Sequence, residues 1–297
     1  MSPPPRWNHS NLTRMMKRNR PATIELTGPG GEPVDFRRTL ASHGVAVLPP
    51  NRVDEGAWTL QRTLTRGTLH AVESPPGRVT FGPRSAERTL RRMLNLDEDL
   101  SGFYAVAAED PLLAWTTRGA GRMLRNPTVY EDVVKTICTT NCAWSATVRM
   151  VTALVEKLGG GTFPTAEAMA EADEEFYRDV VRAGYRGAYL RSLAADVAGG
   201  QIDLEALLDP ELPDQEVADR LLALPGVGPY AAAHVMMLVG RYSRLILDSW
   251  TRPKYALVNR GRKATDRTIE RRFRRYGPYA GLAFWLYLTR DWVDDGA

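Results

Sequence analysis

Cysteine is scarce in this chain of 297 residues, which contains only Cys138 and Cys142. Two thiols cannot supply the four ligands that an iron–sulfur cluster requires. The two residues stand four positions apart in a stretch with helical spacing. A paired metal site or a redox role therefore stays open, although we favour buried structural thiols. We expect the protein to work without a metal ion or a cofactor.

Long apolar runs are also missing. No run approaches the ~20 residues that cross a bilayer as a helix. The N-terminus is rich in proline and then basic, without the apolar core of a signal peptide. We therefore expect a cytoplasmic protein that does not bind membranes.

Acidic residues are nearly missing from one segment. Between Arg252 and Arg275 there are ten lysines and arginines against only Asp266 and Glu270, a local net charge of +8, whereas the whole chain carries +4. A concentrated basic face suits a polyanion such as nucleic acid. A solvated helix face would give the same pattern, and the segment by itself does not separate the two interpretations.

The N-terminal part of the chain predicts a β-domain. Residues 1–21 are Pro-rich and basic and are expected to form an arm. Residues 22–85 contain short apolar runs separated by turn residues, a pattern typical of an antiparallel sheet. The expected strands are Thr23–Thr27, Gly44–Leu48, a third around Leu60, and a hairpin made of Leu69–Glu73 and Arg78–Phe81.

From residue 86 to residue 297 the apolar spacing is that of helices. The fold class is therefore α+β, mostly α, with the sheet before the helices. A chain of this length predicts two or three subdomains. The expected helices include Tyr130–Cys142, Ala146–Leu158, Ala188–Ala198, Gln215–Ala223 and an aromatic-rich segment in Phe273–Trp292.

A short turn interrupts the helical pattern within residues 214–240, and it reads Leu224-Pro225-Gly226-Val227-Gly228. The glycines permit positive φ and leave backbone amides uncovered, while Pro229 stands where proline favours the start of a second helix. Two helices joined in this way present N–H groups and a helix N-terminus to an anion. We expect a nucleic-acid phosphate, because no Walker lysine follows the glycines and no dinucleotide fingerprint surrounds them.

Asp248 follows the apolar run Leu245–Leu247, just past the helix that begins at this turn. By itself it would be read as a helix N-cap. Together with the turn, it resembles the signature of the helix-hairpin-helix DNA glycosylase superfamily, in which a hairpin and a Gly/Pro-rich loop precede a catalytic aspartate. The resemblance is nearest to the branch of 3-methyladenine DNA glycosylase II and oxoguanine glycosylase. It implies a small β-domain followed by a two-lobed helical domain.

The resemblance also assigns roles at the expected DNA surface. Asn141 is similar to an asparagine that fills the gap left by the flipped base. Tyr185 and Arg186 are similar to a tyrosine and an arginine that wedge beside the orphan base. The residues also allow simpler interpretations, namely a helix cap for Asn141, a half-buried aromatic side chain for Tyr185 and a surface charge for Arg186.

Tyr230 stands where bifunctional members of the superfamily carry a Schiff-base lysine. A phenol cannot form an imine with a sugar aldehyde, so the resemblance implies a monofunctional hydrolase without lyase activity. Trp250 replaces a histidine of the oxoguanine enzymes, and Ala146 falls near the position of their cytosine-reading arginine. Tyr230 and Trp250 suit an aromatic wall for a cationic alkylated base, and ordinary core packing is the alternative.

We therefore expect a monomeric, nucleoid-associated DNA glycosylase of base excision repair that acts on double-stranded DNA. It would hydrolyse the N-glycosidic bond of a flipped-out damaged purine, with an alkylated purine as the expected base, and leave an abasic site. Asp248 would stabilise the cationic sugar of the transition state. Two alternatives stay open: a glycosylase for oxidised or deaminated bases on the same scaffold, and a non-catalytic protein that uses the hairpin as a phosphate clamp.

Overall fold

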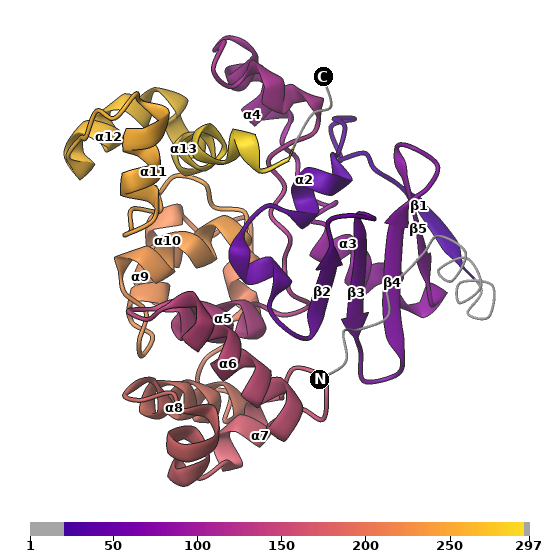
Figure 1. Ribbon diagram of the computed structural model, residues 1–297, viewed down its shortest axis with the longest axis vertical. Coiled ribbons are helices and arrows are strands. Elements are labelled where there is room, and N and C mark those ends of the chain that lie inside the picture. Colours follow the sequence, from indigo (N-terminus) through magenta and orange to yellow (C-terminus); the bar gives the residue numbers. More distant parts are fainter. Residues whose placement is uncertain (1–20, 294–297) are drawn as a thin grey trace.

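The computed structural model describes residues 21–293, so the expected arm over residues 1–21 lies almost wholly outside the described residues. An antiparallel sheet comes first and a larger helical part follows (Figure 1). The predicted α+β fold class is confirmed. Within residues 21–293, no helix has both the length and the apolar character needed to cross a membrane.

Five antiparallel strands form the sheet in the order β1-β5-β4-β3-β2. The predicted hairpin is confirmed as β4 and β5, and β1 pairs with β5 so that Ala22 lies opposite Phe81. Buried side chains such as Leu60 and Leu69 pack in one core with Leu90 of helix α3. The strands are β1 Ala22–Glu25, β2 Asn51–Asp54, β3 Thr59–Thr63, β4 Thr68–Glu73 and β5 Arg78–Gly82.

The strand predicted at Gly44–Leu48 is wrong, because Gly44–Val47 forms a short 3-10 helix. This run lies between two cores: Val45 packs with the helices, and Ala46 packs with the sheet. Val45 and Ala46 are adjacent and both buried, while Gly44 and Val47 are exposed, so the burial does not alternate as it would along a half-buried strand. The edge strand β2 was not predicted because its sequence is polar, as edge strands often are.

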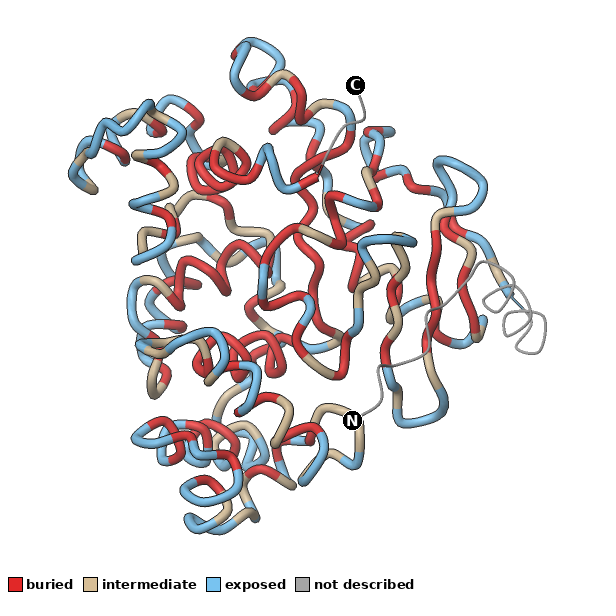
Figure 2. Tube along the Cα trace, viewed as in Figure 1, coloured by how far each residue is buried: buried red, intermediate tan, exposed pale blue. Residues whose placement is uncertain are grey.

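The helices form two further cores, and α10 lies between them. Val235 and Met236 of α10 pack in the core built with α5, α6, α8 and α9, whereas Met237 and Leu238 pack in the core built with α4 and α13. A helix that is apolar all round belongs in the interior, and Figure 2 shows α10 buried along its length after its first two residues. The helices are α2 Phe36–Leu40, α3 Glu87–Met93, α4 Ser101–Ala108, α5 Val129–Thr139, α6 Trp144–Ala153, α7 Ala166–Glu171, α8 Arg186–Ala198, α9 Asp214–Leu222, α10 Pro229–Leu238, α11 Thr251–Val258, α12 Asp266–Phe273 and α13 Ala280–Thr289.

Buried charges join the sheet to α5. The guanidinium of Arg62 in β3 pairs with the carboxylate of Glu131 in α5 at 2.6 Å, and the same carboxylate pairs with the ammonium of Lys135 at 2.7 Å. The amide oxygen of Asn126 accepts a further bond from Lys135 Nζ at 2.8 Å. Removing one partner of such a cluster would leave a buried charge uncompensated. The cluster therefore fixes α5, the helix that ends just before Asn141, against the sheet.

Candidate functional site

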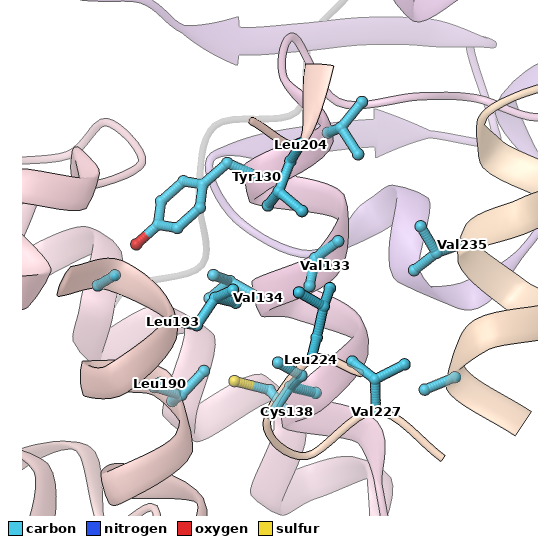
Figure 3. Close-up of a cluster of buried hydrophobic side chains, with 14 of the residues drawn as sticks. Tyr130, Val133, Val134, Cys138, Leu190, Leu193, Leu204, Leu224, Val227 and Val235 are labelled. Atoms are coloured by element: carbon cyan, nitrogen blue, oxygen red, sulfur yellow. The ribbon is translucent and has the colours of Figure 1, made fainter. Parts of the chain in front are cut away.

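The hairpin between α9 and α10 is anchored by its two apolar side chains. Leu224 and Val227 are buried in the same core as Cys138 of α5 (Figure 3). Gly226 has a φ of +80°, and a Cβ atom there would lie 2.8 Å from Cδ2 of Tyr189. The fold therefore requires glycine at position 226, because a side chain would strain the backbone and collide with the ring.

Nothing in the described residues of the free protein requires glycine at position 228. Its backbone is extended, with a φ of −96°, and a Cβ atom there would meet nothing within 4 Å. The positive φ that the sequence allowed at both glycines is therefore found at Gly226 but not at Gly228. Pro229 begins α10 as predicted. Within the described residues, the amides of Gly226 and Gly228 donate no hydrogen bond, so they and the helix N-terminus are available to an anion.

Asp248 caps α11, the helix that follows the hairpin pair. Its Oδ1 atom accepts hydrogen bonds from the backbone N–H groups of Trp250 at 2.9 Å and Thr251 at 2.6 Å. Thr251 Oγ1 accepts in return from the N–H of Asp248 at 2.8 Å. Asp248 therefore caps the turn that leads into α11, two residues before the N-cap position at Trp250, and this uses only one carboxylate oxygen. Oδ2 accepts no hydrogen bond from the residues that the structure describes, so the cap leaves it available for chemistry.

Tyr230 lies in the first turn of α10 and packs against both helical cores. Its hydroxyl is 3.2 Å from Oγ1 of Thr139 at the end of α5. Burial raises the pKa of Tyr230, and the negative charge of Asp248 raises it further. Tyr230 is therefore a neutral phenol whose pKa is raised in part by the carboxylate of Asp248.

The Trp250 side chain is partly exposed and contacts two other tryptophan rings. Its exposed fraction is 40%, and its ring centroid lies 5.6 Å from that of Trp285 and 5.4 Å from that of Trp292. Sequence reasoning missed both partners, since they come from α13 and the turn after it, far along the chain. The three rings form an aromatic cluster two residues beyond Asp248.

A cleft of about 510 Å³ borders the first turn of α10. Pro229 and Tyr230 line one side, and Arg244, Arg252 and Arg274 are among the residues that line the rest. Asp248 does not line this cleft. Guanidinium groups bind phosphate well, so the cleft suits the backbone of a nucleic acid better than a buried base.

The structure brings together the three residues that the resemblance places beside the orphan base. Asn141 Nδ2 donates to the hydroxyl of Tyr185 at 3.3 Å. The guanidinium carbon of Arg186 lies 4.6 Å from the centre of the Tyr185 ring. Tyr185 itself is 54% exposed, which leaves a large part of its ring free to meet another flat group.

Arg186 is not the surface charge that the sequence also allowed. Its side chain is buried, and its guanidinium donates to the backbone carbonyl of Thr140. The next residue, Asn141, has a φ of +47° just beyond the end of α5, a left-handed conformation that asparagine tolerates well at helix ends. Arg186 therefore holds the turn that presents Asn141.

The structure divides the basic segment into two groups of side chains. Four of its ten cations have partners within the protein: Arg252 pairs with Asp266, Lys254 with Asp291 and Arg275 with Asp110, and Arg272 donates to Asn259. The others are exposed and form no ion pair with a described residue: Arg260, Arg262, Lys263, Arg267, Arg271 and Arg274. The α11 and α12 helices, with the loop between them, bear most of the cations of the segment. These helices, the α9–α10 hairpin and α8 follow one another down one side of the molecule, opposite the sheet (Figure 1).

The two cysteines have the environment of packing residues. Burial raises the pKa of the Cys138 thiol to about 12, so it stays protonated and poorly reactive. The sulfur of Cys142 lies 3.3 Å from Oγ1 of Thr147. Between residues 21 and 293, no group of three or more histidine, cysteine, aspartate or glutamate side chains is arranged to hold a metal ion.

The hairpin, the aspartate behind it and the basic side of the molecule define a nucleic-acid-binding protein of the helix-hairpin-helix class. A family model described as "HhH-GPD superfamily base excision DNA repair protein" matches residues 134–279. The chain belongs to this superfamily, as the resemblance predicted, and it is a DNA glycosylase of base excision repair.

Its relatives come from two branches of the superfamily. The chain is 27% identical to the N-glycosylase/DNA lyase OGG1 of Arabidopsis thaliana, over 94% of this chain and 78% of that protein. It is 24% identical to a DNA-3-methyladenine glycosylase of Bacillus subtilis, over 52% of this chain and only 54% of that protein.

Solved structures from both branches share the fold. A structure of MBOgg1 in complex with a low affinity DNA ligand superposes with a TM-score of 0.71 at 19% identity, over 92% of this chain and 96% of that one. The 3-methyladenine DNA-glycosylase from Archaeoglobus fulgidus superposes with a TM-score of 0.68 at 20% identity, over 92% of this chain and 100% of that one. The order of an N-terminal sheet and two helical cores is therefore common to this chain and to both branches.

Proposed function

We propose that this protein is a monofunctional glycosylase that removes a damaged purine, with an alkylated purine as the expected base, from double-stranded DNA. The observation that carries the proposal is the geometry of Asp248. One of its carboxylate oxygens is fixed by the N-terminus of α11, while the other accepts no hydrogen bond from the described residues. A carboxylate held in this way is oriented before the substrate arrives, which is the requirement for electrostatic stabilisation of a transition state.

The proposed reaction hydrolyses the bond between the base and C1′ of the sugar. Hairpin amides and the exposed cations hold the phosphates while the damaged base leaves the stack, a step that costs roughly a few kcal/mol. The base then departs with the bonding electrons, and the sugar develops positive charge opposite Asp248 Oδ2. A water molecule adds to C1′ and gives up a proton to the carboxylate, which leaves an abasic site and the free base.

The absence of lyase chemistry is proposed from Tyr230. Its hydroxyl is bound to Thr139 and cannot form an imine with the sugar aldehyde. Lys254, six residues beyond Asp248, is paired with Asp291 at 2.6 Å. Borohydride trapping on an abasic duplex checks this proposal, and we expect no covalent adduct. An adduct in good yield would show that another amine supports a lyase step.

A glycosylase for oxidised bases is the second candidate, because a relative named N-glycosylase/DNA lyase aligns over nearly the whole chain. A plain phosphate clamp is disfavoured by the prepared carboxylate at Asp248. We expect DNA to be the partner, since several structures with this fold contain it.

Incubation with a panel of duplexes carrying single lesions, followed by hot alkali, tests the function directly. We expect strand breaks after alkali but not before it, with lesion-bearing duplexes cut in preference to undamaged ones. Tight binding without base release from any duplex would instead identify a clamp.

A further inference from the structure

Two buried histidines have no role in the chemistry described so far. His43 precedes the short helix Gly44–Val47, and His234 lies in α10. Their ring centroids are 5.1 Å apart at an interplanar angle of 71°. Within the described residues, both ring nitrogens of His234 and Nδ1 of His43 are buried without a hydrogen-bond partner. Buried polar atoms without partners are rare and costly in native proteins, so these three nitrogens require a partner that residues 21–293 do not supply.

The protonation of the pair follows from its contacts. His43 Nε2 lies 2.8 Å from the carbonyl oxygen of Leu124, so Nε2 must carry the hydrogen. Burial lowers the pKa of His43 to about 4 and that of His234 to about 3, so both rings are neutral at physiological pH. His43 Nδ1 is therefore a hydrogen-bond acceptor, and His234 offers one N–H donor and one acceptor.

A chain of contacts leads from Asp248 to the histidines on each side. On one side, the negative charge of Asp248 raises the pKa of Tyr230. The Tyr230 ring centroid lies 6.3 Å from that of His234, one turn further along α10. On the other side, Trp250 contacts Trp285. The two sides meet at residues 42–43, because Trp285 Nε1 donates to the carbonyl of Ser42 at 2.8 Å and His43 follows directly. The two histidines are therefore connected to the surroundings of Asp248 through Tyr230 on one side and through Trp285 and Trp250 on the other.

We propose that His43 and His234 read the N7 edge of the extruded base and select a purine that presents an N–H donor beside an acceptor on that edge. The inference rests on the proposed function and adds the chemical pattern that the site accepts. The acceptor of His43 requires a donor on the base, and the donor of His234 requires an acceptor next to it. On the N7 edge, adenine has this pair at N6–H and N7, whereas unmodified guanine has only the acceptors N7 and O6 there.

Two kinds of damaged base carry the selected pattern. 3-Methyladenine keeps the amino group and N7 of adenine, and 8-oxoguanine carries a hydrogen on N7 beside O6. Hypoxanthine is the matched negative control, because deamination replaces the amino donor on the N7 edge with a second acceptor and adds a donor only at N1, on the other edge. A methylated A·T-rich duplex supplies 3-methyladenine, and synthetic duplexes supply the other two bases, so that the rates of base release separate the sources.

Replacements at the pair test the inference under single-turnover conditions. His234→Phe removes both nitrogens but keeps a flat ring, and His234→Gln restores a donor and an acceptor. His43→Gln keeps a donor toward Leu124 but moves the acceptor away from the position of Nδ1, because the amide oxygen is attached to the same carbon as the donor nitrogen. His70→Gln in the sheet controls for the loss of a buried imidazole. We expect His234→Phe and His43→Gln to slow release of the preferred base roughly 5- to 100-fold, with partial recovery in His234→Gln and none of this effect in His70→Gln.

A duplex with a tetrahydrofuran abasic site, which has no base to read, separates recognition from folding and DNA grip. We expect each variant to bind it within about twofold of the wild-type affinity, since the groups that bind phosphate are intact. Wild-type release of hypoxanthine as fast as 3-methyladenine and 8-oxoguanine would overturn the inference. Unchanged base preference in folded His234→Phe and His43→Gln would also overturn it. A wild-type protein that releases no base from any duplex would instead refute the proposed function itself.

Discussion

The hairpin, residues 224–228, and the wedge, which consists of Asn141, Tyr185 and Arg186, are both expected to meet the DNA, but they present different groups to it. At the hairpin, Leu224 and Val227 point into the core, and the backbone of Gly226 and Gly228 is left to meet the phosphate. At the wedge, the side chains themselves are presented, and Tyr185 is more than half exposed. We therefore expect the hairpin to bind through backbone N–H groups, which every residue type except proline possesses, and the wedge to bind through side chains that can be deleted one at a time. Mutations should act differently in the two regions, and the proposed catalytic carboxylate belongs to neither.

The largest effect is expected from Asp248→Asn. Asparagine is as good an N-cap as aspartate, so α11 should remain intact, but the neutral amide no longer opposes the positive charge that develops on the sugar. We expect single-turnover base release to fall by roughly 10²- to 10³-fold or more. Affinity for DNA should be unchanged or higher. A mutant with near-wild-type turnover would show that Asp248 is only a cap.

The second effect concerns the two glycines of the hairpin. Gly228→Val places its side chain in open space in the free protein, so the fold should persist, with at most a modest loss of stability. The new side chain would stand where the phosphate approaches, and we expect affinity for an undamaged duplex to fall roughly tenfold or more.

Gly226→Ala is the contrasting variant, because its strain and its collision with Tyr189 exist without DNA. It should lower the free energy of unfolding by roughly 1–3 kcal/mol. Thermal melts and DNA titrations on both variants measure the difference. A folded Gly228→Val protein that binds DNA like the wild type would rule out the hairpin as the phosphate clamp.

The third effect distinguishes the role of Tyr185 from that of Arg186 in the wedge. Tyr185→Ala should leave the melting temperature nearly unchanged and slow base release roughly tenfold, since base–aromatic stacking is worth about 1–3 kcal/mol. Arg186→Met should instead lower stability by about 1.5–3 kcal/mol, because the buried hydrogen bond to the Thr140 carbonyl is removed. Equal thermal stability of the two variants would contradict this division of roles.

The smallest effect is expected from single charge reversals on the basic side. Arg267 is exposed in α12 and forms no ion pair with a described residue. Arg267→Glu should lower DNA affinity and flatten the slope of log K against log[salt] by roughly 0.9 for each phosphate that the protein no longer neutralises. Arg88→Glu in α3, which packs on the sheet, makes the same charge change away from this side. Equal salt slopes for the two variants would place the DNA elsewhere.

Local chemistry made several features predictable from the sequence. The glycine turn, Pro229 at a helix start and the β4–β5 hairpin all follow from backbone preferences of adjacent residues. The α+β class follows from the change of apolar period along the chain. The cap at Asp248 was predictable for the same reason, because the residues that it binds are its near neighbours.

Only the tertiary structure decided which partners each side chain would have. Gly44–Leu48 is apolar enough for a strand, but its position between two cores made it a 3-10 helix. Arg186 is buried and donates a hydrogen bond to the Thr140 carbonyl, instead of lying on the surface, because α8 packs beside the end of α5. The His43–His234 pair joins residues that lie far apart in the sequence. Such contacts depend on how whole elements pack, and no short-range pattern in the sequence records that packing.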